Sequence, residues 1–257
     1  MKAVILAGGL GTRLSEETAV KPKPMVEIGG MPILWHIMKT YAAHGVDDFV
    51  VLCGYRGHVI KEFFASYAAR RSSVRFDLGS GAMEILDAPA EPWTVTLVDT
   101  GEDTMTGGRI RRAREHIGDE TFFLTYGDGV SDVDLTALLA QHRREGAEVT
   151  LTAVQPPGRF GALTLAPGQT RVESFEEKPE GDRAWINGGY FCVEPAAIDR
   201  IDGDATSWEQ EPLRRIAAAG GLGAFQHTGF WHPMDTLRDK NHLESLWDSG
   251  RAPWRVD

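Results

Sequence analysis

Short, mainly apolar runs in the first half of the chain predict buried strands. A run without polar interruptions, as at residues 3–6, is typical of a strand covered by other elements on both sides. These runs lie at residues 3–6, 49–53 and 122–126, and each is followed by glycine within two residues. Apolar residues at helical spacing, which predict helices, lie at 32–43, 59–69 and 133–144. This order of strand and helix predicts right-handed crossovers and a parallel sheet.

The second half has a different pattern, with strand-like segments that follow one another closely. Strands are expected at 149–154, 161–165, 172–175 and 186–193, and helices at 209–219 and 236–248. Earlier in the chain, strand-like residues 74–77 and 94–98 flank a loop or hairpin, and a short basic helix is expected at 110–116. We therefore predict an α/β fold, Rossmann-like, with a predominantly parallel mixed sheet flanked by helices. A small added β region is expected in the second half of this single domain, residues 1–257.

Composition excludes several classes of protein. Of the 257 residues 42% are apolar and 25% are charged, which is ordinary for a soluble globular protein. The net charge of −10 argues against general nucleic-acid binding, which needs a basic surface. No apolar run approaches the roughly 18 residues of a membrane span. Cys53 and Cys192 form no CxxC motif, so we expect inert thiols in a cytoplasmic protein.

A glycine-rich loop follows the first predicted strand, in Leu6-Ala7-Gly8-Gly9-Leu10-Gly11-Thr12-Arg13-Leu14. Glycines here let backbone N–H groups approach a ligand closely, although a plain turn has the same composition. It is neither a dinucleotide fingerprint nor a Walker A loop, because Leu14 stands in place of the third glycine and no GK[ST] follows. Arg13 and Lys23, the latter between two prolines, favour a triphosphate site over a solvated basic turn.

Two acidic residues are candidate metal ligands. Asp128 follows the third buried run, and Asp235 directly precedes the last predicted helix. Each, taken alone, also fits a turn former or a helix cap. Together they could hold Mg²⁺ through oxygen ligands. The glycines at 188 and 189, inside an apolar strand, indicate close approach by a ligand or by another strand.

Taken in order, these motifs resemble a known family. LAGGLGTRL, KPKPM, YGDG, FEEKP and INGGYF are similar to the sugar-1-phosphate nucleotidyltransferases, and EPWTVTLVDTG, MTGGR, PPGRFGAL, WEQEPL and FWHPMDTLRDK resemble its cytidylyltransferase members. The resemblance implies Mg²⁺-dependent transfer of a cytidylyl group from CTP to α-D-glucose 1-phosphate, giving CDP-glucose and pyrophosphate. It also implies a homo-oligomer, with residues 1–150 as the nucleotide-binding half and 151–257 as the sugar-binding and closing half.

The resemblance also assigns roles by position. The nucleotide and its phosphates would lie against Leu6, Ala7, Gly8, Gly9, Leu10, Gly11 and Thr12. Arg13 would bind the triphosphate, Lys23 the phosphate under attack, and Asp128 and Asp235 the Mg²⁺. Further substrate contacts would be Thr104, Gly108, Arg109 and Gly127, with Glu177, Lys178, Asn187 and Gly188 around the sugar phosphate.

Arg109 also suggests a physical basis for base choice. Cytosine presents acceptors at N3 and O2, whereas uracil and thymine carry a donor at N3. A guanidinium only donates, and it would therefore favour cytosine.

Three other functions are compatible with parts of this pattern. A related enzyme could use UTP, dTTP or a different sugar phosphate. An NAD(P)-dependent oxidoreductase is disfavoured by Leu14 and by the lack of an acidic residue at the end of the second strand, where Leu52-Cys53-Gly54 stand. A catalytically silent nucleotide-binding protein would be expected to lack one of the phosphate-binding cations or acidic residues, and all are present.

Overall fold

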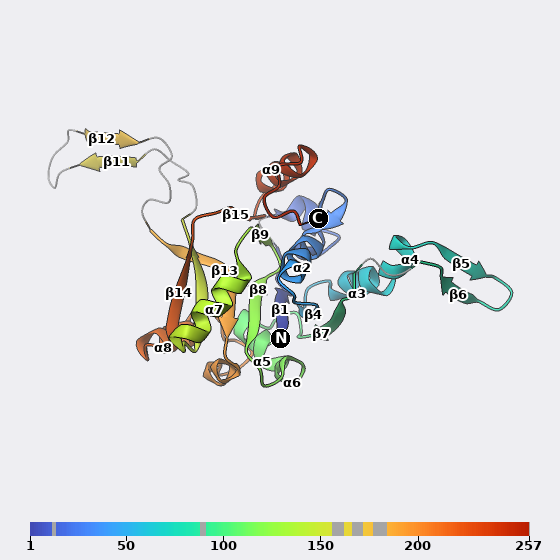
Figure 1. The fold of residues 1–257 in the computed structure, drawn as a ribbon, viewed down its shortest axis with the longest axis horizontal. Coiled ribbons are helices and arrows are strands. Elements are labelled where there is room, and N and C mark those ends of the chain that lie inside the picture. Colours follow the sequence, from blue (N-terminus) through green and yellow to red (C-terminus); the bar gives the residue numbers. More distant parts are fainter. Residues whose placement is uncertain (12–13, 88–90, 156–161, 166–171, 177–183, 257) are drawn as a thin grey trace.

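The centre of the fold is a seven-stranded sheet that receives strands from both halves of the chain (Figure 1). The computed structural model describes residues 1–11, 14–87, 91–155, 162–165, 172–176 and 184–256. In spatial order the strands are β14 (Leu222–His227), β10 (Val149–Val154), β13 (Ile186–Val193), β8 (Phe122–Tyr126), β1 (Lys2–Ala7), β4 (Asp48–Cys53) and β7 (Thr94–Asp99). Within this sheet β13 is antiparallel to both of its neighbours, and the other pairings are parallel.

Helices cover both faces of the sheet. Along β1, Ala3 and Ile5 belong to one buried cluster and Val4 and Leu6 to another, because successive side chains of a strand point to opposite faces. The first cluster takes side chains from α2 (Ile33–Ala43), α3 (Gly57–Ala65), α7 (Leu135–Glu145) and α9 (Leu237–Asp248). The second takes them from α5 (Thr106–Arg112), α6 (Arg114–Ile117) and α8 (Glu211–Ala218). The predicted mixed α/β sheet flanked by helices is thus confirmed.

The remaining elements are short. Helices α1 (Ser15–Thr18) and α4 (Tyr67–Arg71) and 3₁₀ turns at Lys23–Met25 and Pro195–Arg200 complete the helical part. Four small antiparallel pairs are β2 (Glu27–Ile28) with β3 (Met31–Pro32), β5 (Val74–Asp77) with β6 (Ala82–Ile85), β9 (Gly129–Ser131) with β15 (Trp231–Pro233), and β11 (Ala162–Leu165) with β12 (Val172–Glu176). The pairs β5–β6 and β11–β12 project from opposite sides of the body (Figure 1). None of the helices in the described part of the chain is long and apolar enough to cross a membrane.

Two helices and one strand differ from the sequence prediction. The helix expected at 59–69 is interrupted at Ser66, which ends α3 and precedes α4. The helix expected at 110–116 begins earlier, at Thr106, and is interrupted at Ala113. Strand β14 was not predicted, because it is an edge strand that contains a glycine and is only partly buried.

The candidate active site

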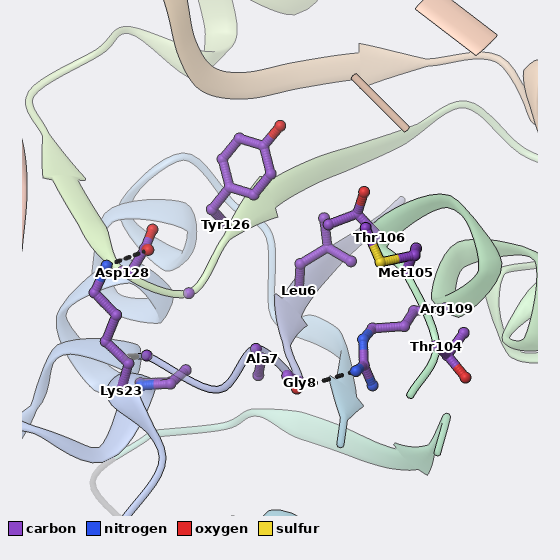
Figure 2. A pocket seen from close by; sticks show the side chains of 14 residues that line it. Leu6, Ala7, Gly8, Lys23, Thr104, Met105, Thr106, Arg109, Tyr126 and Asp128 are labelled. Carbon is purple, nitrogen blue, oxygen red and sulfur yellow. Dashed lines mark hydrogen bonds and ion pairs between the residues drawn. The ribbon is translucent and has the colours of Figure 1, made fainter. Parts of the chain in front are cut away.

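A cavity of about 370 Å³ opens where β1 and β8 end (Figure 2). The two strands are adjacent and parallel, so their carboxyl ends lie at the same edge of the sheet. In α/β sheets this edge is where ligands bind. The cavity is lined by Leu6, Ala7, Gly8, Gly9, Gly11, Lys23, Pro24, Thr104, Met105, Thr106, Arg109, Tyr126, Gly127 and Asp128.

The glycine-rich loop passes directly over a buried guanidinium. A Cβ atom on Gly8 would lie 2.2 Å from Nη1 of Arg109, and one on Gly54 would meet the same nitrogen at 2.2 Å. Neither position therefore accommodates a side chain while Arg109 stays in place. Gly11 adopts a φ of +63°, a conformation that side chains disfavour. The glycines that suggested a phosphate loop are thus needed for packing around Arg109 as well.

Arg109 ties together three strand ends around the cavity. Its Nη2 donates to the carbonyl oxygens of Gly8, at 3.0 Å, and Glu102, at 2.9 Å. Its Nη1 donates to Thr100 Oγ1 at 2.8 Å and Gly101 O at 2.6 Å, with a longer contact of 3.4 Å to Cys53 O. The residue is 4% exposed, and burial lowers its pKa from the ordinary value. Both terminal nitrogens are therefore engaged by the protein, so a bond from either to a base requires an exchange of partners.

Lys23 joins two carboxylates that are far apart in the sequence. Its Nζ lies 2.6 Å from Oδ2 of Asp128 and 2.6 Å from Oδ1 of Asp235, which are 105 and 212 residues away (Figure 2 shows the bond to Asp128). Prolines on both sides restrict the backbone, and the lysine begins a 3₁₀ turn. Its exposed fraction is 8%. Lys23, Asp128 and Asp235 therefore form one cluster.

The charges in this cluster favour an ionised lysine. Burial works to lower the pKa of Lys23, but the charges of Asp128 and Asp235 and their hydrogen bonds outweigh it, and the pKa lies above its ordinary value. Asp235 is not the cap of α9. Thr236 holds that position, where its hydroxyl accepts from the backbone of Asp239 in a capping box.

The same two carboxylates fit a divalent cation. Two oxygens, one from Asp128 and one from Asp235, lie within 2.6 Å of a single point. The described residues contain no group of three or more acidic, histidine or cysteine side chains that could hold a metal on its own. Mg²⁺ suits such an incomplete set, because proteins commonly hold it through one or two carboxylates together with substrate phosphates.

Other predicted site residues lie around or away from the cavity. Leu10, Gly108, Asn187 and Gly188 are not among the residues that line it. Gly108 faces the backbone of Asp204, and a Cβ there would lie 2.5 Å from Asp204 O. Gly188 packs against Val154, and Gly189, with a φ of +81°, against the Tyr126 ring, so the prediction of close approach by another strand is confirmed. Thr12, Arg13, Glu177 and Lys178 lie outside the described residues.

Four residues of the lining were not predicted. Pro24, Met105, Thr106 and Tyr126 all face the cavity. Tyr126 ends the buried run before Gly127, and Met105 and Thr106 belong to the MTGGR segment. Because they are adjacent in sequence to predicted contacts, they could have been included in the candidate site. Nothing in their residue types points to a ligand.

Comparisons with known proteins place the chain in a family. Residues 2–218 match the family model for nucleotidyl transferases. The chain is 61% identical, over all of its 257 residues and 99% of the relative, to glucose-1-phosphate cytidylyltransferase of Salmonella typhimurium. It is 44% identical, over the full length of both chains, to the probable glucose-1-phosphate cytidylyltransferase of Bacillus subtilis.

The fold has solved counterparts too. The crystal structure of HddC from Yersinia pseudotuberculosis superposes with a TM-score of 0.69, at 24% identity, over 96% of this chain and 99% of that one. At this identity the likeness concerns the fold alone. The full-length matches and the family model together establish that the chain belongs to the nucleotidyl transferase family, the family of the glucose-1-phosphate cytidylyltransferases that it resembles from end to end.

Proposed function

We propose that the protein transfers the cytidylyl group of CTP to the phosphate of α-D-glucose 1-phosphate and releases pyrophosphate. The observation that carries the proposal is the cluster of Lys23, Asp128 and Asp235 at the edge of a glycine-lined cavity. The full-length identity to cytidylyltransferases that act on glucose 1-phosphate supports the choice of both substrates.

The chemistry requires charge relief and alignment. The phosphate of the sugar is already anionic, so it attacks the α-phosphorus of CTP without a general base. A bond forms between this oxygen and the α-phosphorus as the bond to pyrophosphate breaks. The negative charges on both substrates must be screened, and the reacting atoms must be held in line. The cavity is lined by the glycine loop, whose backbone N–H groups we expect to serve these tasks, and by Lys23 with its ammonium.

Lys23 has two roles in this scheme. In the free protein its ammonium forms ion pairs with both Asp128 and Asp235. When the triphosphate enters, we expect Lys23 to turn to the α-phosphate, which leaves the two carboxylates to hold Mg²⁺. Bound Mg²⁺ would supply Lewis-acid screening of the phosphate charges. The lysine and the two carboxylates thus exchange partners within a single cluster.

The remaining contacts rest on the family resemblance. Arg13 would bind the triphosphate, Lys178 the sugar phosphate, and Glu177, Asn187 and Gly188 would lie near the sugar. The described Asn187 side chain donates to Tyr126 Oη at 3.4 Å, which supports a position close to the cavity wall. In this scheme residues 1–150 bind the nucleotide and 151–257 bind the sugar and close the site.

We assign the base side of the cavity to Thr104 and Arg109. Both line it, on the far side of the glycine loop from Lys23 (Figure 2). Arg109 would favour cytosine by donating to N3, which is an acceptor in cytosine alone, in place of one of its present backbone partners.

We also propose a homo-oligomer. The β5–β6 hairpin projects from the body and exposes apolar side chains, with Leu78 92% exposed and Phe76 57% (Figure 1). Exposed apolar patches on projecting elements mark protein contacts. Sedimentation velocity of the wild type and of Leu78→Ser tests this, because the variant is expected to shift towards monomer.

A cytoplasmic, reducing location is proposed as well. It is supported by the free thiols of Cys53 and Cys192, since oxidising compartments favour disulfides.

The proposed reaction is tested by product analysis. Incubation with CTP, glucose 1-phosphate and Mg²⁺ should yield CDP-glucose and pyrophosphate in equal amounts, seen by ³¹P NMR and mass spectrometry. Formation of CMP without a sugar nucleotide would contradict the proposed transfer.

A further inference from the structure

The carboxylate of Glu209, which does not line the cavity, bridges two residues of its walls. Tyr126 Oη donates to Oε1 of Glu209 at 2.7 Å, and Thr106 Oγ1 donates to Oε2 at 2.7 Å. Tyr126 and Thr106 both line the cavity, whereas Glu209 is exposed and is not part of the lining. Both of its oxygens are therefore engaged by the cavity walls.

The two donors belong to different parts of the proposed site. Tyr126 is the last residue of β8 and stands two residues before Asp128. Thr106 is the first residue of α5, which carries Arg109 one turn later. The bridge through Glu209 thus connects the wall with the phosphate and metal residues to the wall with the base residues. Asn187 joins the same network through its bond to Tyr126 Oη.

The segment that carries Glu209 is anchored without its side chain. The backbone N–H of Trp208 donates to Thr106 Oγ1 at 2.9 Å, and that of Met105 donates to Asp204 O at 2.8 Å. Trp208 is fully buried against Phe191. Because the backbone here is held by these bonds and by Trp208, loss of the Glu209 carboxylate alone should leave the fold intact.

We propose that Glu209 is a positioning residue, which fixes the separation of the base wall and the phosphate wall through its bonds to Thr106 and Tyr126. The inference rests on the proposed function, because that function assigns the two walls to the two ends of CTP. Hydrogen bonds to an ionised carboxylate are stronger than neutral ones.

The test compares Glu209→Ala and Glu209→Gln with Glu211→Gln as the matched control. Glu211 is two residues away, exposed, and paired with Arg214 and Arg215 on α8. Glu209→Ala is expected to lower kcat/KM about 10- to 100-fold, the scale of a small misplacement of reacting groups, with a lower kcat and a higher KM for CTP. Glu209→Gln should recover part of the loss, and Glu211→Gln should match the wild type. A Glu209→Ala enzyme with wild-type kcat and KM would overturn the proposal.

A double variant separates positioning from a general structural effect. Tyr126→Phe removes one donor of the bridge, so adding Glu209→Ala to it should cost much less than it costs in the wild type. If the decrease in kcat/KM of the double variant equals the product of the two single decreases, the two residues act independently, and the proposal would be overturned. Melting temperatures should stay close to that of the wild type.

The failure of this inference can be told apart from failure of the proposed function. A wild type without turnover would count against the function. Calorimetric titration with CTP and Mg²⁺ needs no turnover, and weaker binding by Glu209→Ala than by Glu211→Gln would still support the bridge. Equal binding by the two variants would count against it.

Discussion

Replacing Lys23 with methionine removes the ammonium that ties Asp128 to Asp235 and keeps a side chain of similar length. In the free protein the ammonium stands where the two carboxylates would hold Mg²⁺. A divalent cation that enters without nucleotide must therefore displace it. We expect Lys23→Met to bind a free divalent cation more tightly than the wild type, although the variant should lose turnover because the phosphate loses its lysine.

The size of the effect follows from the two bonds. Each hydrogen bond to a charged group contributes roughly 1.5–3 kcal/mol. Solvent weakens these bonds, since the side chains of Asp128 and Asp235 are 34% and 16% exposed. We take the net gain in cation-binding free energy as about 1.4 kcal/mol, which is half or less of the summed contribution of the two hydrogen bonds. This gain corresponds to about tenfold tighter binding. We therefore predict at least a tenfold gain in affinity.

Mn²⁺, a spectroscopic substitute for Mg²⁺, provides the assay. Titration followed by electron paramagnetic resonance, without nucleotide, gives the affinity of the free protein directly. Lys21→Met is a matched control, because Lys21 lies two residues away and pairs with Glu27 at 3.6 Å. Adding Asp128→Asn to Lys23→Met should abolish the gain. Equal Mn²⁺ affinities for the wild type and Lys23→Met would refute the idea that the lysine and the metal compete for one position.

Three further predictions concern single residues. Asp128→Asn should abolish turnover without changing the circular dichroism spectrum, because Asp128 is a proposed metal ligand outside the core; retained Mg²⁺-dependent activity would count against this role. Arg109→Ala should lose the preference for CTP over UTP in competition assays, and a fully retained preference would exclude Arg109 as the selecting group. Burial lowers the pKa of His36 to about 4, so between pH 6.5 and pH 4 the unfolded chain takes up a proton that the folded one does not. The free energy of unfolding should fall by about 3 kcal/mol over this range in urea titrations, and His36→Gln should flatten the slope; an unchanged slope would contradict the assignment.

The sequence predicted the parts of the fold that local pattern determines. The runs at β1, β4 and β8 are mainly apolar, and their order with the helices implied a mainly parallel sheet. The glycine loop after β1 and the aspartate after β8 could be placed at one edge of this sheet for the same reason. Strand β14 could not be found, since an edge strand that is half exposed has no strong pattern.

Contacts between residues far apart in the sequence could not be predicted from local hydrophobic patterns. Nothing near Asp235 in the sequence indicates that it meets Lys23, 212 residues away. The residue types suggested a joint metal site with Asp128, but not that the two carboxylates converge. The family resemblance suggested a substrate contact at Gly108. In the structure, Gly107 and Gly108 make room for the backbone of residues 204–206. That packing involves a segment about a hundred residues downstream, and a local sequence pattern does not reveal such a contact.

The identity of the transferred nucleotide is the central claim, and one assay tests it most directly. Pyrophosphate release is measured with glucose 1-phosphate and Mg²⁺, comparing CTP, UTP, dTTP and ATP side by side, each with an EDTA control. The account predicts release with CTP that is lost in EDTA, and little or none with the other three. Release with UTP or dTTP in place of CTP would contradict the proposed function, as would release that persists in EDTA.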